Sequence, residues 1–197
     1  MKTILAVSFF GIVTFAFADY TKIQNCEQPE AMQNFDANKF LKGTWYVTNA
    51  KQGSESTVCR EYKAGNENGE LNGDGYYNFK GQKTYFQVSC KKTSENKGKM
   101  TFQCTQRGTV SGNEMNFQFQ LEVTIVSTDY NSYAVMYRCV KLPTELGGGY
   151  EDNVLILRRD AKQTEVESIK ATVKNQEWTL DKFISRKDDT CSKLSQK

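Results

Sequence analysis

Six cysteines are the residues with the clearest chemical capacity in this sequence, and they occur without a single histidine. No two of them have the Cys-x-x-Cys spacing that is typical of zinc or redox sites. A zinc centre needs free cysteine or histidine ligands, and the common nucleophilic triads need a histidine base. The composition therefore excludes triads that use histidine, and it predicts a protein with no metal and no cofactor.

The cysteines are better explained as disulfides of an exported chain. Lys2 precedes an apolar run from Ile4 to Phe17, and Ala16-Phe17-Ala18 is a small-x-small cleavage pattern. We therefore expect residues 1–18 to be a signal peptide and residues 19–197 to form one secreted, extracellular domain. Three disulfides are then expected, and counting alone leaves their pairing open. The cysteines are Cys26, Cys59, Cys90, Cys104, Cys139 and Cys191.

Other catalytic patterns are weak. Glu61 and Asp129 could be imagined as an acid–base pair, but the carboxylates are scattered over expected polar faces and turns. There is no Gly-x-Ser-x-Gly elbow and no phosphate loop, and the run Gly147-Gly148-Gly149 is not followed by a helical pattern. The formal net charge is only +3, with dispersed lysines and arginines. We expect a binding protein rather than an enzyme, with neither nucleic acid nor membrane as its partner.

The elements that would position a binding site are β-strands. The clearest runs from Met115 to Ile125, where apolar residues alternate with polar ones, as in a strand with one dry and one wet face. Short turn sequences rich in Gly, Asn and Asp separate the candidates. Eight are expected: Thr44–Asn49, Thr57–Lys63, Gly75–Lys80, Lys83–Lys91, Lys99–Thr105, Met115–Ile125, Tyr133–Val140 and Asn153–Arg159.

Eight consecutive strands joined by short turns remove their free edges by closing into an antiparallel up-and-down barrel, with a β-sandwich as the alternative. The pattern changes after the last strand. Within Thr164–Asn175, Val166, Ile169 and Val173 have helical spacing, and a second short amphipathic piece follows from Trp178. We expect these C-terminal helices to pack on the outside of the barrel.

Three short motifs resemble the lipocalin signatures. Gly43-Thr44-Trp45-Tyr46 opens the first strand, Thr128-Asp129-Tyr130 precedes the seventh, and Arg158 or Arg159 ends the eighth. In that family an arginine lies over the tryptophan and seals the closed end through a cation–π contact. We assign this barrel-closing role to Trp45 and Arg158. The resemblance implies an eight-stranded lipocalin barrel.

A closer resemblance covers nearly the whole mature chain. Thr57–Lys63, and Phe183–Asp188 before Cys191, are similar to the salivary lipocalins of blood-feeding triatomine bugs, which include triabin, pallidipin and the nitrophorins. Phe86–Cys90 and Phe102–Cys104 are similar to the triabin and pallidipin branch, which carries an extra disulfide. The resemblance implies the disulfide pairs Cys26–Cys139, Cys59–Cys191 and Cys90–Cys104.

Nitrophorins hold haem through a histidine, whose position falls near Tyr77 here. Tyrosine ligates haem in some proteins, but a strand tyrosine is usually structural, and we expect no haem. Strand parity instead suggests an apolar barrel interior that holds one small ligand or is filled by side chains. The family resemblance implies that such a ligand is a lipid mediator such as a thromboxane or leukotriene, or a biogenic amine. The candidate interior residues are Val47, Tyr77, Phe86, Phe117, Phe119 and Met136.

The loops at the open end are the alternative binding surface. They are expected at residues 50–56 and 142–152, and relatives in this family use such loops against a clotting protease or against contact factors such as factor XII and kininogen. The candidate partner-binding residues are Lys51, Gln52, Ser54, Glu55, Glu145 and Tyr150.

Together with the expected signal peptide, this resemblance implies a secreted anti-haemostatic salivary lipocalin, which we expect to be monomeric. Its function is then inhibition of host coagulation, through contact and kallikrein–kinin factors or thrombin, or of platelet activation. The first alternative is a scavenger of a small lipid or amine agonist, and the second is a carrier unrelated to haemostasis.

The oxidation state is directly testable. Because all six cysteines are expected in disulfides, the intact mass of the secreted chain should lie about six hydrogens below that of the reduced chain. Mass spectrometry with and without reductant measures this difference, and a smaller difference would show free thiols.

Overall fold

The computed structural model describes residues 21–65, 69–79, 82–144, 147–163 and 167–195. The expected signal peptide lies outside these residues. Within them, no helix is both long and apolar enough to cross a membrane.

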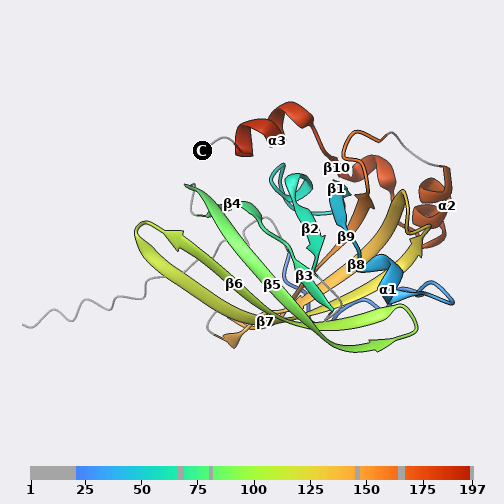
Figure 1. The fold of residues 1–197 in the computed structure, drawn as a ribbon, viewed down its shortest axis with the longest axis horizontal. Coiled ribbons are helices and arrows are strands. Elements are labelled where there is room, and N and C mark those ends of the chain that lie inside the picture. The colour runs from blue at the N-terminus through green and yellow to red at the C-terminus, as the bar shows by residue number, and fades with distance from the viewer. Residues whose placement is uncertain (1–20, 66–68, 80–81, 145–146, 164–166, 196–197) are drawn as a thin grey trace, which may run out of the picture.

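The strands run up and down and close into a barrel (Figure 1). The wall closes because the first and last long strands pair with each other, with Tyr46 opposite Arg158 and Ala50 opposite Leu155. The short strands β3 and β4 both pair with β5 and together occupy one position of the wall, so the barrel wall has eight strand positions. The strands are β1 (Thr44–Ala50), β2 (Glu61–Ala64), β3 (Glu70–Asn72), β4 (Gly75–Phe79), β5 (Gln82–Asn96), β6 (Lys99–Val110), β7 (Asn113–Thr128), β8 (Tyr133–Lys141) and β9 (Tyr150–Arg158).

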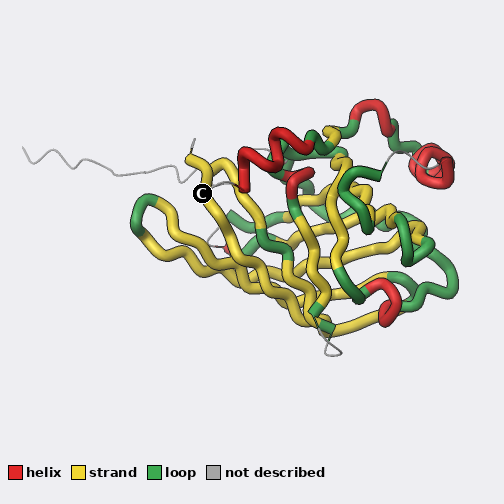
Figure 2. Tube along the Cα trace, turned by 45° about the horizontal axis from the view of Figure 1, so that its top comes forward, coloured by secondary structure: helices red, strands yellow, loops and turns green. Residues whose placement is uncertain are grey.

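The C-terminal segment packs outside the wall, as expected, and Figure 2 shows its helices on one side of the strands. Ile169 and Val173 of α2 are buried against Val135 and Tyr137, which point outward from β8. The predicted Val166 lies outside the described residues. The remaining elements are α1 (Ala37–Phe40), η1 (Thr57–Cys59), α2 (Glu167–Asn175), η3 (Leu180–Lys182), β10 (Ile184–Ser185) and α3 (Asp188–Ser195).

One predicted strand begins too early. Thr57–Cys59 forms a turn of 3-10 helix, and β2 starts only at Glu61. Val58 is 1% exposed, and the backbone N–H of Arg60 bonds to the Thr57 carbonyl. Val58 is therefore buried by a turn that leads into the strand rather than by the strand itself.

The closed end of the barrel is built around Trp45, which is 1% exposed. Its indole N–H donates to the Phe40 carbonyl at 2.9 Å, and the guanidinium carbon of Arg159 lies 3.5 Å from its ring centroid. Arg159 also donates to the carbonyls of Lys42, Thr44 and Tyr130. One side chain therefore holds three separate chain segments together.

The assignment of this role to Arg158 is wrong. Arg158 is the last residue of β9 and pairs with Tyr46 and Tyr133. Successive residues of a strand point to opposite faces, so only one of the two arginines can lie over the ring of Trp45, which points into the barrel. That residue is Arg159.

The disulfides are those that the family resemblance implies. Cys26–Cys139 attaches the N-terminal segment to β8, and Cys59–Cys191 attaches α3 to η1. Cys90–Cys104 links two directly opposite residues of β5 and β6. Because the first two bonds enclose long stretches of chain, they restrict the unfolded ensemble most.

Replacing Arg159 by alanine should destabilise the fold. The change removes a cation–π contact and several hydrogen bonds from a charged donor, so the free energy of unfolding should fall by about 2–4 kcal/mol. Lys162→Ala, an exposed cation three residues along, is the control and should change it by less than about 0.5 kcal/mol. Urea unfolding followed by circular dichroism measures both, and equal effects would contradict a closing role.

Candidate functional site

A pocket lies inside the barrel below its open end, with a cavity volume of about 60 Å³. Seven of the eight wall positions contribute to it, all except β1. Its walls are mostly apolar and aromatic, with three charged side chains among them. The lining residues are Arg60, Tyr62, Leu71, Gly73, Val88, Cys90, Gln106, Phe117, Phe119, Leu121, Arg138, Val140, Leu142, Pro143 and Glu151.

The charged side chains are Arg60, Arg138 and Glu151, each at most 7% exposed. Arg138 on β8 and Glu151 on β9 form an ion pair with an N–O distance of 3.8 Å. Buried charges are normally paired because removing an isolated charge from water is costly. Two guanidinium groups against one carboxylate leave this pocket with a net positive charge.

Glu151 is the one acidic residue among the described residues that line the pocket, and its pKa is shifted. Burial raises the pKa of its carboxyl above the usual 4.5, although Arg138 and Arg60 act in the opposite direction. Oε2 of Glu151 has no hydrogen-bond partner among the described residues. The carboxyl group is therefore held where its charged form is poorly solvated.

The pocket suits an amphipathic group with an anionic end, but it is small. Small-molecule sites in proteins typically measure roughly 300–1,000 Å³, whereas the present cavity of about 60 Å³ has room for only a few water molecules. No cluster of three or more potential metal ligands occurs in the described part of the chain.

Only two of the predicted interior residues line this pocket, Phe117 and Phe119. Val47 and Met136 face inward, but they are buried in the packed core beneath it. Phe86 packs instead against Val110, with Met115 beside them. The side chain of Tyr77 lies outside the described part of the structure. Strand alternation identifies which residues point inward. Their position along the barrel axis decides which of them reach the cavity.

None of the three charged residues was predicted from the sequence to line the interior. The signal for Arg138 was present, because it continues the inward series of Ala134 and Met136. Arg60 likewise lies two residues before Tyr62, which also lines the pocket. An arginine at an inward position of a strand was the feature that could have identified both.

The loop between β1 and η1, residues 51–56, lies at the rim and is fixed by hydrogen bonds. The backbone N–H of Gln52 donates to Oδ1 of Asn153 at 3.0 Å, and Asn153 donates back to the Gln52 carbonyl at 2.9 Å. The hydroxyls of Ser54 and Ser56 are 2.9 Å apart. Lys51, at the start of the loop, lies 3.8 Å from the carboxylate of Glu27. This loop is therefore ordered by its own contacts and by β9.

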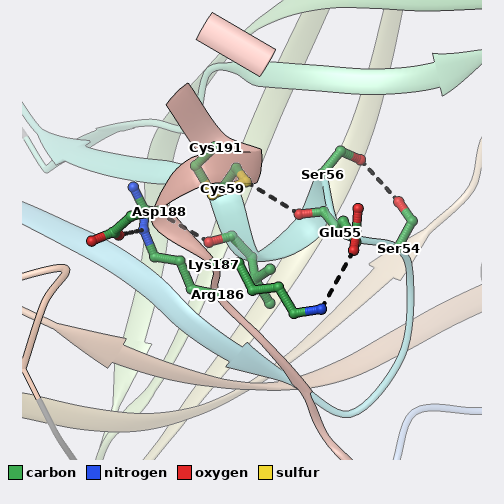
Figure 3. The surroundings of a disulfide bond; sticks show 9 residues. Ser54, Glu55, Ser56, Cys59, Arg186, Lys187, Asp188 and Cys191 are labelled. Carbon is green, nitrogen blue, oxygen red and sulfur yellow. Dashed lines mark hydrogen bonds and ion pairs between the residues drawn. A yellow bond between two sulfur atoms is a disulfide. The ribbon is translucent and has the colours of Figure 1, made fainter. Parts of the chain in front are cut away.

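The C-terminal tail completes the rim (Figure 3). Cys191 is bonded to Cys59, which brings the tail beside the rim loop. Nζ of Lys187 lies 4.0 Å from the carboxylate of Glu55, and both side chains are more than 60% exposed. Asp188, half exposed, pairs with Arg186 at 3.8 Å. We call Glu55, Lys187 and Asp188 the rim charges.

The second predicted loop is shorter than expected. The amide of Leu142 donates to the Gly149 carbonyl, and Gly147 donates to Thr144, so hydrogen bonds close this turn. Glu145 lies outside the described residues. The prediction that Tyr150 is a loop residue is wrong. Tyr150 begins β9 and its backbone also bonds to Ile23, because the N-terminal segment covers this strand end.

The family profile described as Triabin matches residues 19–172. The chain belongs to the triabin family. Among curated relatives of this triabin-family chain, Triafestin-2 of Triatoma infestans is 52% identical, over all of this chain and 97% of that protein.

Solved structures of similar fold bind small ligands. The complex of LTBP1 with leukotriene C4 is 28% identical to the triabin-family chain, with a TM-score of 0.55 over 75% of this chain and 84% of that one. The tryptamine complex of the amine-binding protein of Rhodnius prolixus is 18% identical, with a TM-score of 0.58 over 87% of this chain and 96% of that one. The second likeness shows the lipocalin-type fold alone.

The raised pKa of Glu151 predicts a pH dependence. The folded chain binds this proton more tightly than the unfolded chain, so the stabilisation is complete below about pH 4.5 and is lost as pH rises through the raised pKa. Relative to Glu151→Gln, the free energy of unfolding of the natural chain should fall by about 1.4 kcal/mol per pH unit across that interval.

Urea titrations between acid and neutral pH measure this difference. Glu167→Gln is the control, because Glu167 is an exposed residue of α2 and the difference should not change with pH. A difference that grows with pH would show that Arg138 and Arg60 outweigh burial.

Proposed function

We propose that this chain is a secreted salivary protein that impairs host haemostasis by binding a coagulation protein, and that its target belongs to the contact phase that activates kallikrein. Within the coagulation proteins, thrombin is the alternative target. Membership of the triabin family supports the proposal, because the family resemblance implies binders of host clotting factors. The 52% identity with Triafestin-2 of Triatoma infestans also supports it.

The observation that carries the proposal is the small interior. A cavity of about 60 Å³ is several-fold below the volume that usually encloses a small-molecule ligand. Phe117, Phe119 and the ion pair of Arg138 with Glu151 line this small space. A protein target that contacts the outside of the barrel needs no such space.

The rim offers a surface suited to a protein partner. Its loop is held by hydrogen bonds to Asn153, and its tail is held by the Cys59–Cys191 disulfide. A preorganised surface loses less conformational entropy on binding. Glu55 and Lys187 are exposed, and charges of this kind provide specificity and fast association.

Secretion is part of the proposal. Three disulfides involve all the cysteines, and such bonds persist in oxidising compartments. The apolar N-terminal run supplies the expected export signal.

A second candidate function rests on the buried arginines. Arg60 and Arg138 at the end of an apolar pocket could hold the carboxylate of a lipid mediator, if the side chains around the cavity rearranged to enlarge it. The chain would then act by lowering the free concentration of that mediator.

Clotting assays separate these functions. The purified chain should delay clotting that is started by a contact surface and leave clotting started by tissue factor unchanged, whereas a thrombin target would delay both. Replacing Glu55 and Lys187 together by alanine should reduce the potency about tenfold or more, which corresponds to about 1.4 kcal/mol.

The matched control replaces Glu167 and Lys170, an exposed ion pair on α2, and should leave the potency unchanged. Titration calorimetry with leukotriene C4 and a thromboxane analogue forms the second arm. Tight binding of either without any clotting delay would overturn the proposal in favour of scavenging. Equal loss of potency in both double variants would refute the role of the rim.

A further inference from the structure

The strands at the open end differ strongly in length. β5, β6 and β7 contain 15, 12 and 16 residues, whereas β8 and β9 contain 9 each. The β6–β7 hairpin therefore projects beyond the rest of the wall, as Figures 1 and 2 both show at the left of the molecule. The pairing of β7 with β8 begins only at Gln120, which lies opposite Lys141.

This arrangement leaves the first part of β7 with one strand neighbour instead of two among the described residues. Residues Asn113–Phe119 pair with β6 on one side, and no strand in the described part of the chain pairs with them on the other. Alternate residues of an antiparallel strand point their N–H and C=O groups to the same side. About half of the backbone groups in this segment therefore face outward along a free edge.

The free edge carries few of the features that protect exposed strands. Natural edges are usually short, charged, bulged or interrupted by proline. Here the run from Met115 to Leu121 contains neither a charged residue nor a proline. Its side chains alternate between half-buried Met115, Phe117 and Phe119 and the exposed amides of Asn116 and Gln118. Short uncharged segments of this kind pair readily with identical segments.

We propose that this edge pairs antiparallel with the same edge of a second copy of the chain. A two-fold axis at Phe117 would place Asn116 opposite Gln118 and Met115 opposite Phe119 of the other copy. Amides then face amides, apolar side chains face apolar side chains, and no like charges oppose each other within the segment.

The continuous ladder would extend the sheet from one barrel into the next. The five residues that can pair about this axis, Met115–Phe119, span about 17 Å, which is short compared with the interfaces of permanent dimers. The dimer is therefore reversible and forms at high protein concentration, and dilute protein is monomeric. No rim charge takes part in this contact, so the dimer does not depend on the rim.

Sedimentation velocity over a range from low micromolar to near-millimolar protein tests the proposal. The natural chain should shift from monomer to dimer as the concentration rises. The variant Asn116→Lys with Gln118→Lys places lysine opposite lysine across the axis, so it should remain monomeric throughout. A mixture of this variant with Asn116→Glu/Gln118→Glu should dimerise again, because opposite charges then face each other.

The matched control is Gln103→Lys with Thr105→Lys. Gln103 and Thr105 lie on β6, which is paired on both sides, and they face Gln120 and Gln118 of β7. Replacing both by lysine adds the same charge as the edge variant does. This variant should dimerise as the natural chain does. Thermal unfolding checks that every variant is folded. A natural chain that stays monomeric, a lysine variant that still dimerises, or a control that does not would each overturn the proposal.

Discussion

The pairing of β1 with β9 is the constraint on which the other features of the structure depend, and the contact between Arg159 and Trp45 fixes it at the closed end. Without that closure, the sheet would expose two further edges and its inward side chains would have no opposite wall. Closure also brings the rim loop, which follows β1, beside the start of β9. The hydrogen bonds between Gln52 and Asn153 are a direct result. The closed end thus determines the geometry of the open end.

The sequence was sufficient for the overall architecture because the signals were local and repeated. The alternation from Met115 to Ile125 identifies the longest strand, and the structure extends it only at its ends. The lipocalin-like motif at Trp45 located the closed end. The choice between Arg158 and Arg159 failed because both faces of β9 are buried, so its apolar run has no alternation to show which arginine points inward. The register of β9 on β1 decides this, and no short window of sequence contains it.

The pocket could be predicted only in part. Phe117 and Phe119 were identified from parity, whereas Arg60, Arg138 and Glu151 were not. Hydrophobic alternation selects apolar residues, so a buried charge at an inward position is discounted by the same rule that finds the strand. The ion pair of Arg138 with Glu151 also requires the register of β8 on β9, which the sequence does not specify. A buried charge of this kind is therefore identified by its inward position in the strand and not by the hydrophobic pattern.

The attachment of the C-terminal tail has a wider consequence. Because the Cys59–Cys191 bond brings Lys187 and Asp188 to the open end, this part of the surface is encoded in a segment that contributes no long strand to the barrel wall. A change in the length or composition of the tail would reshape that surface without disturbing the packing of the strands. Proteins with the same barrel can in this way acquire different recognition properties at little risk to their folding.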